Sequence, residues 1–358
     1  MPKIAVYSIA LNEIKHVERY MNACQDADYI IVADTGSTDG TPEKLRELGA
    51  SVYDISIKPW RFDDARNAAL ALVPADADVC VILDLDEVPQ AGFFDKVRKG
   101  WKTGSHTGWI TMDTGSKWQK DRLHSRHGWH WKYPCHEHQM WYGEGDMKQS
   151  FILDAEIKHE PDESKSRGQY LTLLEMCVKE YPDDARMWTY MTREYYFHGK
   201  WESVLVSAER TLTLKGWDVE QAATCRWAGE AAHNLGRSET ARHWYDKGAQ
   251  ILPHEGEPWY GVAIDAYRKQ EWERCLDASL NVIQRPRSVH YCYEPAAWDW
   301  KAYDLASIAA YNLKQYDEAL AFCTVAAQAN GPEQERIQRN LDFFKKVVDG
   351  AQAHSKNN

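Results

Sequence analysis

Three acidic side chains, Asp84, Asp86 and Glu87, directly follow the apolar run from Val79 to Leu83. The run is short and does not alternate with polar residues, which is typical of a strand buried on both faces. Because a buried strand cannot keep unpaired carboxylates, we expect the acids at its carboxyl end, where open α/β sheets bind ligands. An extended backbone directs Asp84 and Asp86 to the same side. Two carboxylates there would suit Mg²⁺ or Mn²⁺ carrying a phosphorylated ligand.

Two other interpretations of these acids stay open at this point. The segment from Asp84 to Val88 also fits the phosphatase pattern DxDx(T/V), in which the first aspartate is a nucleophile that becomes phosphorylated. The acids could equally be solvated side chains at an ordinary strand end. The rest of the chain has to decide between them.

Length, composition and net charge narrow the class of protein to which the chain can belong. The chain has 358 residues, of which 44% are hydrophobic and 27% charged, enough for two or three globular domains. Its formal charge of −11 argues against a general binder of nucleic acid or anionic membranes. No apolar run approaches the roughly 18 residues of a spanning helix. The N-terminus enters a strand pattern without a signal peptide, and the eight cysteines form no CxxC, so we expect reduced thiols and a cytoplasmic protein.

Strand and helix patterns alternate through the first part of the chain. Strands are predicted at 4–10, 29–33, 51–55 and 79–83, and helices at 13–24, 42–48 and 62–72. This alternation indicates an α/β domain with a mostly parallel sheet and right-handed crossovers. Parallel strands would bring three polar strand ends to one edge: Asn12-Glu13, Asp34 to Thr41, and Asp84 to Glu87. Neither GxGxxG nor GxxxxGK(S/T) occurs, so a dinucleotide site of the Rossmann type and a P-loop are both unsupported.

Four segments within residues 4–88 resemble, in order and in spacing, the motifs of family 2 glycosyltransferases. They are SIALNE at 8–13, VADTGSTDGT at 32–41, FDDARN at 62–67 and LDLDE at 83–87. The resemblance implies the GT-A fold, a nucleotide-sugar donor, most often UDP-linked, a divalent Mn²⁺ or Mg²⁺ ion, and inversion at the anomeric carbon. It weakens the phosphatase interpretation, whose DxD would be expected on the first strand.

The resemblance also implies roles for individual residues. Asp34 would bind the base, Asn12 and Glu13 would line the nucleoside pocket, and Arg66 and Asn67 would contact ribose or diphosphate. Asp86 would bind the metal, with Asp84 facing the ribose or a metal-bound water. The full set expected at the donor is Ser8, Ala10, Asn12, Glu13, Asp34, Gly36, Arg66, Asn67, Asp84 and Leu85, with Asp84, Asp86 and His159 as metal ligands.

The segment from 101 to 160 is rich in Trp and His and is expected to hold the acceptor. Arg122-Leu123, Gly128 and WKYPCHE at 131–137 are similar to the R-L, G and HE elements of many family members. On that similarity Glu137 is the catalytic base, with Trp131, His136 and His138 on the acceptor side. The sequence departs from many relatives after His159, and Asp162 and Glu163 are reserve bases. The histidine spacing here matches no common structural zinc pattern.

From Lys165 onward the strand patterns disappear and the period becomes 3.6. Turn signals recur at Gly199, Gly236, Gln270 and Lys314, in steps of 37, 34 and 44 residues. The tetratricopeptide repeat has a step of about 34 residues, and such repeats stack into a solenoid. The long step holds an insertion at 285–295, expected to be an ordered loop near a binding face.

We therefore expect a GT-A domain at 1–162, a tetratricopeptide-like helical repeat domain at 163–350 and a disordered tail at 351–358. The expected activity is metal-dependent transfer of a hexose from a nucleotide sugar to a peptide, protein or glycan acceptor. The repeats would either hold the acceptor or pack rigidly and form a homodimer. The alternative from another class is a non-catalytic scaffold with a degenerate transferase domain. No nucleic-acid partner is expected.

Overall fold

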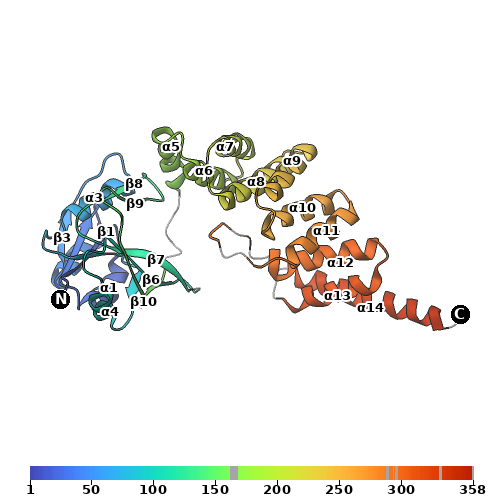
Figure 1. The fold of residues 1–358 in the computed structure, drawn as a ribbon, viewed down its shortest axis with the longest axis horizontal. Helices are drawn as coiled ribbons and strands as arrows, with labels where there is room; N and C mark the ends of the chain where they lie inside the picture. The colour runs from blue at the N-terminus through green and yellow to red at the C-terminus, as the bar shows by residue number, and fades with distance from the viewer. Residues whose placement is uncertain are drawn as a thin grey trace. The chain divides into compact units, whose positions relative to one another are not determined.

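The computed structural model describes residues 1–115, 117–161, 168–287, 290–292, 294, 297–329 and 333–356. The chain forms two compact units, Met1–Cys177 and Val178–Asn358, which are described separately below. In Figure 1 the strands lie in the blue-to-green part of the chain, and the yellow-to-red part is helical.

The first unit contains an eight-stranded sheet with the order β3-β2-β1-β4-β7-β6-β10-β5 and a separate pair, β8-β9. Its strands are β1 (Ile4–Ala10), β2 (Tyr29–Asp34), β3 (Ser51–Asp54), β4 (Val79–Ile82), β5 (Glu87–Pro89), β6 (Thr107–Asp113), β7 (Lys117–His124), β8 (Trp129–Lys132), β9 (His138–Trp141) and β10 (Gln149–His159). Its helices are α1 (Ile14–Cys24), α2 (Thr41–Glu47), α3 (Phe62–Ala71) and α4 (Phe93–Gly100), and α5 (Tyr170–Glu180) spans the division between the units.

The sheet is mixed, and its first half is entirely parallel. Strand β1 pairs in parallel with β2 and β4, and β2 pairs in parallel with β3. In the second half, β7 is antiparallel to β4 and to β6, and β5 is antiparallel to β10. Strand β10, however, pairs in parallel with β6. Beyond β4 the sheet is therefore mixed rather than mostly parallel as expected, because the short link from β6 to β7 can join only antiparallel neighbours.

The alternation of side chains along β1 divides the core of this unit into two layers. Ile4 and Val6 pack with α1, α2 and α4 on one face. Ala5 and Tyr7 pack on the other face with α3 and with Trp131 of β8. Since successive side chains of a strand point to opposite faces, a central strand must be apolar throughout, and all of β4 is buried accordingly.

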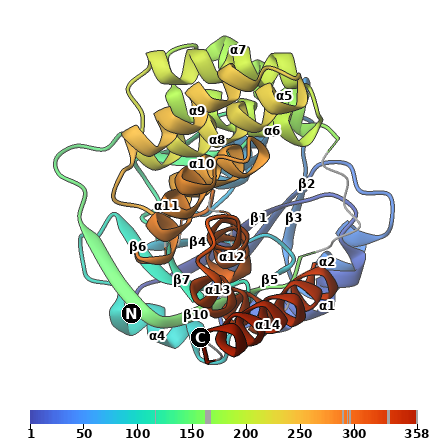
Figure 2. The ribbon, with the colours of Figure 1, turned by 90° about the vertical axis from the view of Figure 1, so that its right-hand side faces the viewer.

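The described residues of the second unit form helices and turns and contain no strand. The helices are α6 (Ala185–Phe197), α7 (Trp201–Thr213), α8 (Asp218–Asn234), α9 (Ser238–Ile251), α10 (Glu257–Arg268), α11 (Trp272–Ile283), α12 (Ala302–Asn312, preceded by a π-helical turn, Ala297–Lys301), α13 (Tyr316–Gln328) and α14 (Gln334–Lys356). Figure 2 shows the pairs α8/α9, α10/α11 and α12/α13 following one another. This is a tetratricopeptide-like arrangement of helical hairpins.

The four turn positions of the sequence are equivalent in the structure. Gly199, Gly236, Gln270 and Lys314 each separate the two helices of a pair, and all have positive φ, between 58° and 72°. In each turn, the amide of the next residue bonds the carbonyl five residues earlier, as Lys200 N–H does with Tyr195 O at 2.9 Å. This is the hydrogen bond of a Schellman helix end, which favours glycine at the left-handed position.

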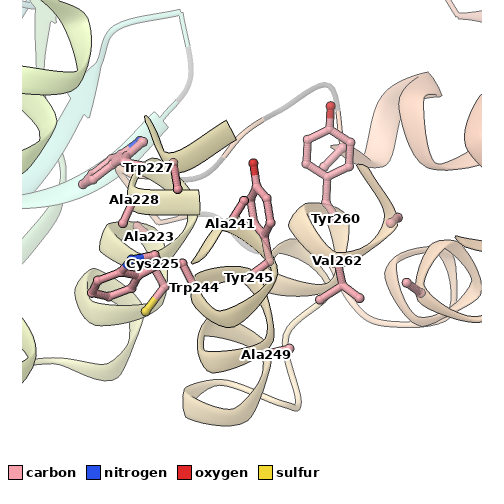
Figure 3. Packing of buried hydrophobic residues seen from close by; sticks show 14 of the residues in the cluster. Ala223, Cys225, Trp227, Ala228, Ala241, Trp244, Tyr245, Ala249, Tyr260 and Val262 are labelled. Carbon is pink, nitrogen blue, oxygen red and sulfur yellow. The ribbon is translucent and has the colours of Figure 1, made fainter. Parts of the chain in front are cut away.

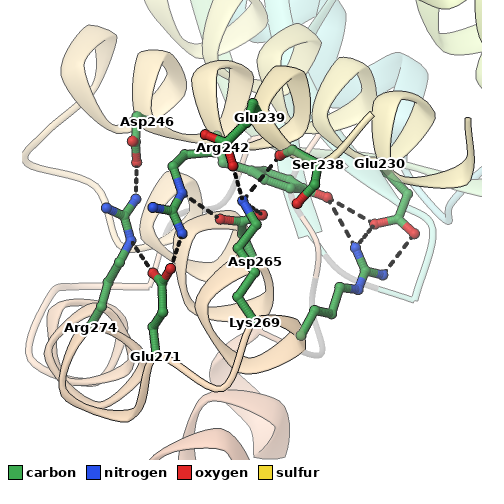
Figure 4. Close-up of polar contacts among 11 residues, drawn as sticks. Glu230, Ser238, Glu239, Arg242, Asp246, Asp265, Lys269, Glu271 and Arg274 are labelled. Carbon is green, nitrogen blue, oxygen red and sulfur yellow. Dashed lines mark hydrogen bonds and ion pairs between the residues drawn. The ribbon is translucent and has the colours of Figure 1, made fainter. Parts of the chain in front are cut away.

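Alanine is the most frequent residue in the core between neighbouring hairpins, where it packs with larger aromatic side chains (Figure 3). A Cβ atom on Gly229 of α8 would lie 2.6 Å from the ring of Tyr245, and one on Gly261 of α10 would lie 2.4 Å from it. The Tyr245 ring, which belongs to α9, is thus held between α8 and α10, which can approach it closely because Gly229 and Gly261 have no side chain. Ion pairs such as Arg268–Glu230 at 2.9 Å and Arg242–Asp265 at 3.4 Å join the same hairpins (Figure 4).

All eight cysteines are buried free thiols. Across the part of the chain that the structure describes, none of the helices combines the length and the apolar character that crossing a membrane would require. The predicted boundaries of the domains and of the tail stay predictions.

Candidate active site

The carboxyl ends of three neighbouring strands place the predicted donor residues together. Strand β1 lies between β2 and β4, so Asn12, Asp34 and Asp84 follow adjacent parallel strands. The chain runs outward from β1 to β2 and β3 on one side and returns to β4 on the other. Open α/β sheets bind ligands outside such a reversal of strand order.

Asn12 and Asp34 organise the loop after β2. The carboxylate of Asp34 accepts the amides of Gly36 and Ser37 at 2.9 Å each and the Ser37 hydroxyl at 2.5 Å. Asn12 has φ 55°. Its backbone N–H donates to Ser37 Oγ at 2.8 Å, and its side-chain oxygen accepts the backbone N–H of Thr38 at 2.8 Å. Gly36 has φ 113°, a conformation that glycine adopts without strain. The loop is therefore ordered before any ligand arrives.

Four other predicted donor residues have structural contacts within the first unit. Ser8 is buried and bonds the Tyr20 hydroxyl at 2.6 Å. The Ala10 carbonyl accepts the Thr35 amide, and the Glu13 amide donates to Thr41 Oγ1 at 2.8 Å. Leu85 is a core residue. These residues fix the ends of β1 and β4.

Arg66 joins two carboxylates from distant parts of the chain. Its Nε donates to Glu137 Oε1 at 2.6 Å, and its Nη2 lies 3.0 Å from Asp84 Oδ1. Its guanidinium lies 5.2 Å from the centre of the Trp131 ring. Burial alone would raise the pKa of Asp84, but Arg66 and Arg122 outweigh it and hold that pKa below its usual value. Asp84 is therefore an ionised carboxylate beside a fixed cation.

Helix α3 positions the segment that carries Glu137. The Asn67 side chain donates to the Trp131 carbonyl at 2.9 Å and accepts the Trp131 amide at 2.8 Å, as a neighbouring strand would. The Phe62 amide donates to the Pro134 carbonyl at 3.0 Å. Arg66, one helical turn from Phe62, then reaches Glu137. Asn67 was expected at the ribose or diphosphate, but its amide group already bonds the backbone of β8.

The segment before Glu137 has an unusual backbone. Tyr133 has φ 83° and His136 has φ 52°, although neither is glycine. Non-glycine residues in this region cost roughly 1 to 3 kcal/mol and occur where the surrounding structure enforces them, often at functional sites. Trp131, Tyr133 and Cys135 of the same segment are buried, and their packing enforces this backbone here.

The Tyr7 hydroxyl connects four strands beneath this segment. It lies 2.9 Å from His124 Nε2, 3.0 Å from Trp131 Nε1 and 3.4 Å from Gln139 Nε2. His124 Nδ1 lies 2.7 Å from the Ser125 carbonyl, so the network is satisfied when a neutral His124 accepts from Tyr7. Trp131, predicted on the acceptor side, is only 6% exposed and holds this network together.

Glu87 and Arg122 complete the site and were not predicted as site residues. Glu87 accepts the Asp84 amide at 3.0 Å and forms an ion pair with Arg122. Glu87 is 2% exposed. Both residues lie in segments that carry the family resemblance, LDLDE and R-L, so their position in those motifs was the available signal.

A cavity of about 240 Å³ opens beside these groups. Its lining includes Arg66, Asp84 and Glu137, and also Arg122, His136 and His138. The structure thus brings the predicted base, one predicted aspartate and all three predicted acceptor-side residues, which include Trp131, to the lining of one cavity. Asn12, Asp34, Asp86 and His159 do not line it.

Asp86 and His159 form a separate pair, with 3.5 Å between Asp86 Oδ2 and His159 Nε2. Adjacent ligands of an octahedral ion with metal–oxygen distances near 2.1 Å lie about 3 Å apart, so this pair fits two positions on Mg²⁺ or Mn²⁺. The described residues contain no group of three or more His, Cys, Asp or Glu that could hold a metal. Asp84, predicted as a further ligand, pairs with Arg66. Phosphates and water would have to complete the coordination.

The reserve bases Asp162 and Glu163 lie outside the described residues. The other histidines of the segment do not form a zinc site within the described ranges, and His124 is enclosed by the Tyr7 network.

Residues 6–151 match the model of glycosyl transferase family 2. A search of curated proteins finds no match.

Solved structures resemble each part of the chain separately. MamA (residues 41 to the end) from Desulfovibrio magneticus RS-1 is 17% identical, with 48% of this chain and 89% of that chain covered and a TM-score of 0.38. YrrB, described as a TPR protein with an unusual peptide-binding site, is 14% identical, with 49% and 84% covered and a TM-score of 0.40. Glucosyl-3-phosphoglycerate synthase from Mycobacterium tuberculosis, in complex with Mn²⁺, UDP and phosphoglyceric acid, is 24% identical, with 32% and 44% covered and a TM-score of 0.28. The chain thus spans less than half of that synthase.

Proposed function

Starting from residues 6–151 as a family 2 glycosyltransferase domain, we propose that this protein is an inverting, metal-dependent glycosyltransferase. It moves a hexose from a UDP-sugar to a peptide, protein or glycan acceptor. The observation that carries the proposal is the cavity wall on which Arg66 holds Asp84 and Glu137. A cavity that places a cation and two carboxylates at the carboxyl end of β4 suits a reaction in which a diphosphate leaves and a proton is removed.

The nucleoside end of the donor binds at the loop from Asp34 to Thr38. Asp34 Oδ1 accepts one hydrogen bond, from the Ser37 hydroxyl. A carboxylate oxygen has two lone pairs, so Oδ1 can accept a further bond from an imide N–H such as that of uracil. The loop keeps Asp34 in place through Asn12, so base binding requires no rearrangement of the backbone.

Asp86 and His159 would hold the divalent ion, which when bound neutralises the negative charge that develops on the leaving diphosphate. Asp84 lies two residues away and remains ionised beside Arg66. It is placed to accept hydrogen bonds from the ribose or from water in the donor site.

Glu137 acts as the general base. In the transfer step the acceptor O–H or S–H loses its proton to Glu137 while its oxygen or sulfur bonds the anomeric carbon. The bond from that carbon to the diphosphate oxygen breaks on the opposite face, and UDP leaves with the electron pair. Arg66 and the left-handed backbone at His136 fix the direction of the Glu137 carboxylate.

The first experiment is a thermal-shift screen of nucleotide sugars with and without Mn²⁺. A ligand that binds only the folded state raises the midpoint by an amount set by its concentration relative to Kd. We expect one UDP-sugar to raise the midpoint in the presence of Mn²⁺, and Asp86→Ala to abolish the shift. Asp95→Ala, which removes an exposed carboxylate of α4, is the matched control and should keep it.

Assays of UDP release and of phosphate release, run beside this screen, identify the alternatives. No shift and no UDP release with any nucleotide sugar would indicate a non-catalytic scaffold. Release of phosphate from a generic phosphate ester, together with a covalent aspartyl phosphate at Asp84, would indicate a phosphatase. Either result rejects the transferase proposal.

A further inference from the structure

The insertion between α11 and α12 binds the helices that begin the first three hairpins. Its described residues, His290, Tyr291, Cys292 and Glu294, are called the strap here. They contact α6, α8 and α10, although α6 lies about a hundred residues earlier in the sequence. These first helices also contact one another in order, α6 with α8 and α8 with α10. The strap therefore lies across one continuous surface of the second unit.

An ion pair of this surface recognises the strap backbone. Arg226 and Glu257 lie 3.1 Å apart, with side chains 16% and 13% exposed. Arg226 Nη2 donates to the Cys292 carbonyl at 2.9 Å, and the Glu294 amide donates to Glu257 Oε1 at 2.9 Å. Such contacts do not depend on the side chains of the strap. This is how a binding site holds a short peptide segment by its main chain.

Side-chain contacts add a tyrosine anchor. The Tyr291 hydroxyl donates to Glu220 Oε1 at 2.6 Å, and its ring lies 5.9 Å from that of Tyr190. The Arg193 guanidinium lies 4.9 Å from the Tyr190 ring and 5.8 Å from the Tyr291 ring. Cys292 is 5% exposed, whereas Tyr291 remains 47% exposed. Cys292 belongs to the buried core of the unit, whereas the Tyr291 side chain is held by a directed polar bond and by ring contacts.

The surface continues beyond the strap. A cavity of about 620 Å³ is lined by Tyr291 together with Arg186, Lys215, Trp217 and Glu220. Trp217 and Lys215 are exposed there. The Trp217 ring already packs edge-on against His290 of the strap, with 5.0 Å between the ring centres. A segment longer than the strap could therefore bind the same surface and extend past Trp217 over the charged groups of this cavity.

We infer that the strap is an intramolecular ligand that closes a peptide-binding groove formed by α6, α8 and α10. The external ligand of the groove is a peptide segment with a tyrosine anchor, which displaces the strap. A tethered segment benefits from a high effective concentration, so few contacts suffice to keep it bound, and a free ligand with more contacts can replace it. This inference does not depend on the transferase reaction.

The test is binding of a labelled peptide with the sequence of residues 287–295, RSVHYCYEP, followed by fluorescence anisotropy under reducing conditions. The apparent Kd equals the intrinsic Kd divided by the fraction of open groove. Tyr291→Ala removes the anchor of the strap, so we expect this variant to bind the peptide at least about tenfold more tightly than wild type. Tyr267→Ala, at an exposed tyrosine of α10 that packs on Trp272, is the control and should bind as wild type does.

Two further measurements keep the result interpretable. Replacing the first tyrosine of the peptide by phenylalanine removes the bond to Glu220 and should weaken binding to Tyr291→Ala about tenfold. If Tyr291→Ala does not fold, Tyr291→Phe serves in its place, with an expected tightening of several-fold. Equal binding to wild type and to a folded strap variant, or no binding to either, would show that the strap is a fixed part of the repeat unit, and the inference would be wrong.

Discussion

Charged residues are arranged differently in the two units. In the second unit they form matched pairs across hairpins, such as Arg274 with Asp246 and Arg268 with Glu230 (Figure 4). In the first unit several acids share few cations. Four carboxylates, those of Asp84, Asp86, Glu87 and Glu137, face Arg66, Arg122 and His159.

The difference separates structural charge from functional charge. Pairs that satisfy each other at a partly exposed interface contribute about 0 to 1 kcal/mol each and fix the register of the hairpins. A surplus of carboxylates beside a cavity costs stability unless a ligand or an ion compensates it. Substitutions of the carboxylates beside the cavity in the first unit should therefore change activity. Substitutions in the second unit should change stability.

The largest effect is expected at the base. Glu137→Gln keeps the shape of the side chain and an acceptor oxygen for Arg66 but cannot take a proton. Removing a general base lowers kcat by about 10²- to 10⁴-fold. The rate of UDP release from the donor found in the thermal-shift screen measures this loss of kcat. The affinity for the donor should change by less than a few-fold. Glu47→Gln, at an exposed residue of α2, is the control. A variant that keeps a tenth of the wild-type kcat would exclude Glu137 as the base.

Low pH should reduce the free energy of unfolding of the first unit, because His124 is buried in its neutral form. Burial lowers the pKa of His124 to about 4, whereas the unfolded chain has the ordinary value of 6.5. Between these values the unfolded state binds more protons, so the free energy of unfolding falls as the pH decreases from 6.5 to 4. Two to three pKa units correspond to a loss of about 3 kcal/mol.

Urea unfolding across that pH range measures this loss. His124→Gln cannot bind the proton and should show a flatter pH dependence over the same range. The groups that face His124 from adjacent strands, Tyr7 and Trp129, do not titrate there. An unchanged pH profile in His124→Gln would assign the acid sensitivity to other groups.

The position of the donor residues at the carboxyl ends of the strands could be predicted from the sequence, because short local patterns determine where each strand ends. Apolar runs that end in Asn12, Asp34 and Asp84 mark strand ends, and parallel pairing brings such ends together. The equivalence of Gly199, Gly236, Gln270 and Lys314 was visible for the same reason, since each follows a helical pattern directly.

The partners inside the site could not be predicted. Arg66 contacts Asp84 and Glu137, which lie 18 and 71 residues away in the sequence. Asn67 belongs to the same motif as Arg66, yet its amide holds the backbone of Trp131. A motif indicates that residues serve one site, but which of them contact ligand and which position others depends on long-range packing.

The second unit should respond to substitution at its close contacts. Gly261→Ala places a Cβ atom 2.4 Å from the Tyr245 ring. Overpacking of this kind costs about 1 to 3 kcal/mol, more than the helix propensity that alanine adds. Gly350→Ala, at a helical glycine with open space around it, should be neutral or slightly stabilising. Thermal unfolding of both variants tests this, and donor binding should be unchanged in each. Equal stability of the two variants would contradict the close packing of Tyr245.

The smallest effect is expected at the two turns that lack glycine. Gln270 and Lys314 adopt φ 58° and 63°, where a side chain costs about 1 to 2 kcal/mol. Glycine removes this strain but makes the unfolded chain more flexible, which offsets roughly 0.4 to 1 kcal/mol. Gln270→Gly and Lys314→Gly should therefore each stabilise the second unit by about 0.5 to 1 kcal/mol. The reverse change, Gly236→Lys, should destabilise it by a similar amount because the turn geometry is the same.

Denaturant unfolding of the three variants distinguishes an effect of backbone strain from a contribution of the side chain. If Lys314→Gly is destabilising while Gly236→Lys behaves as expected, the Lys314 side chain contributes more than its backbone strain costs.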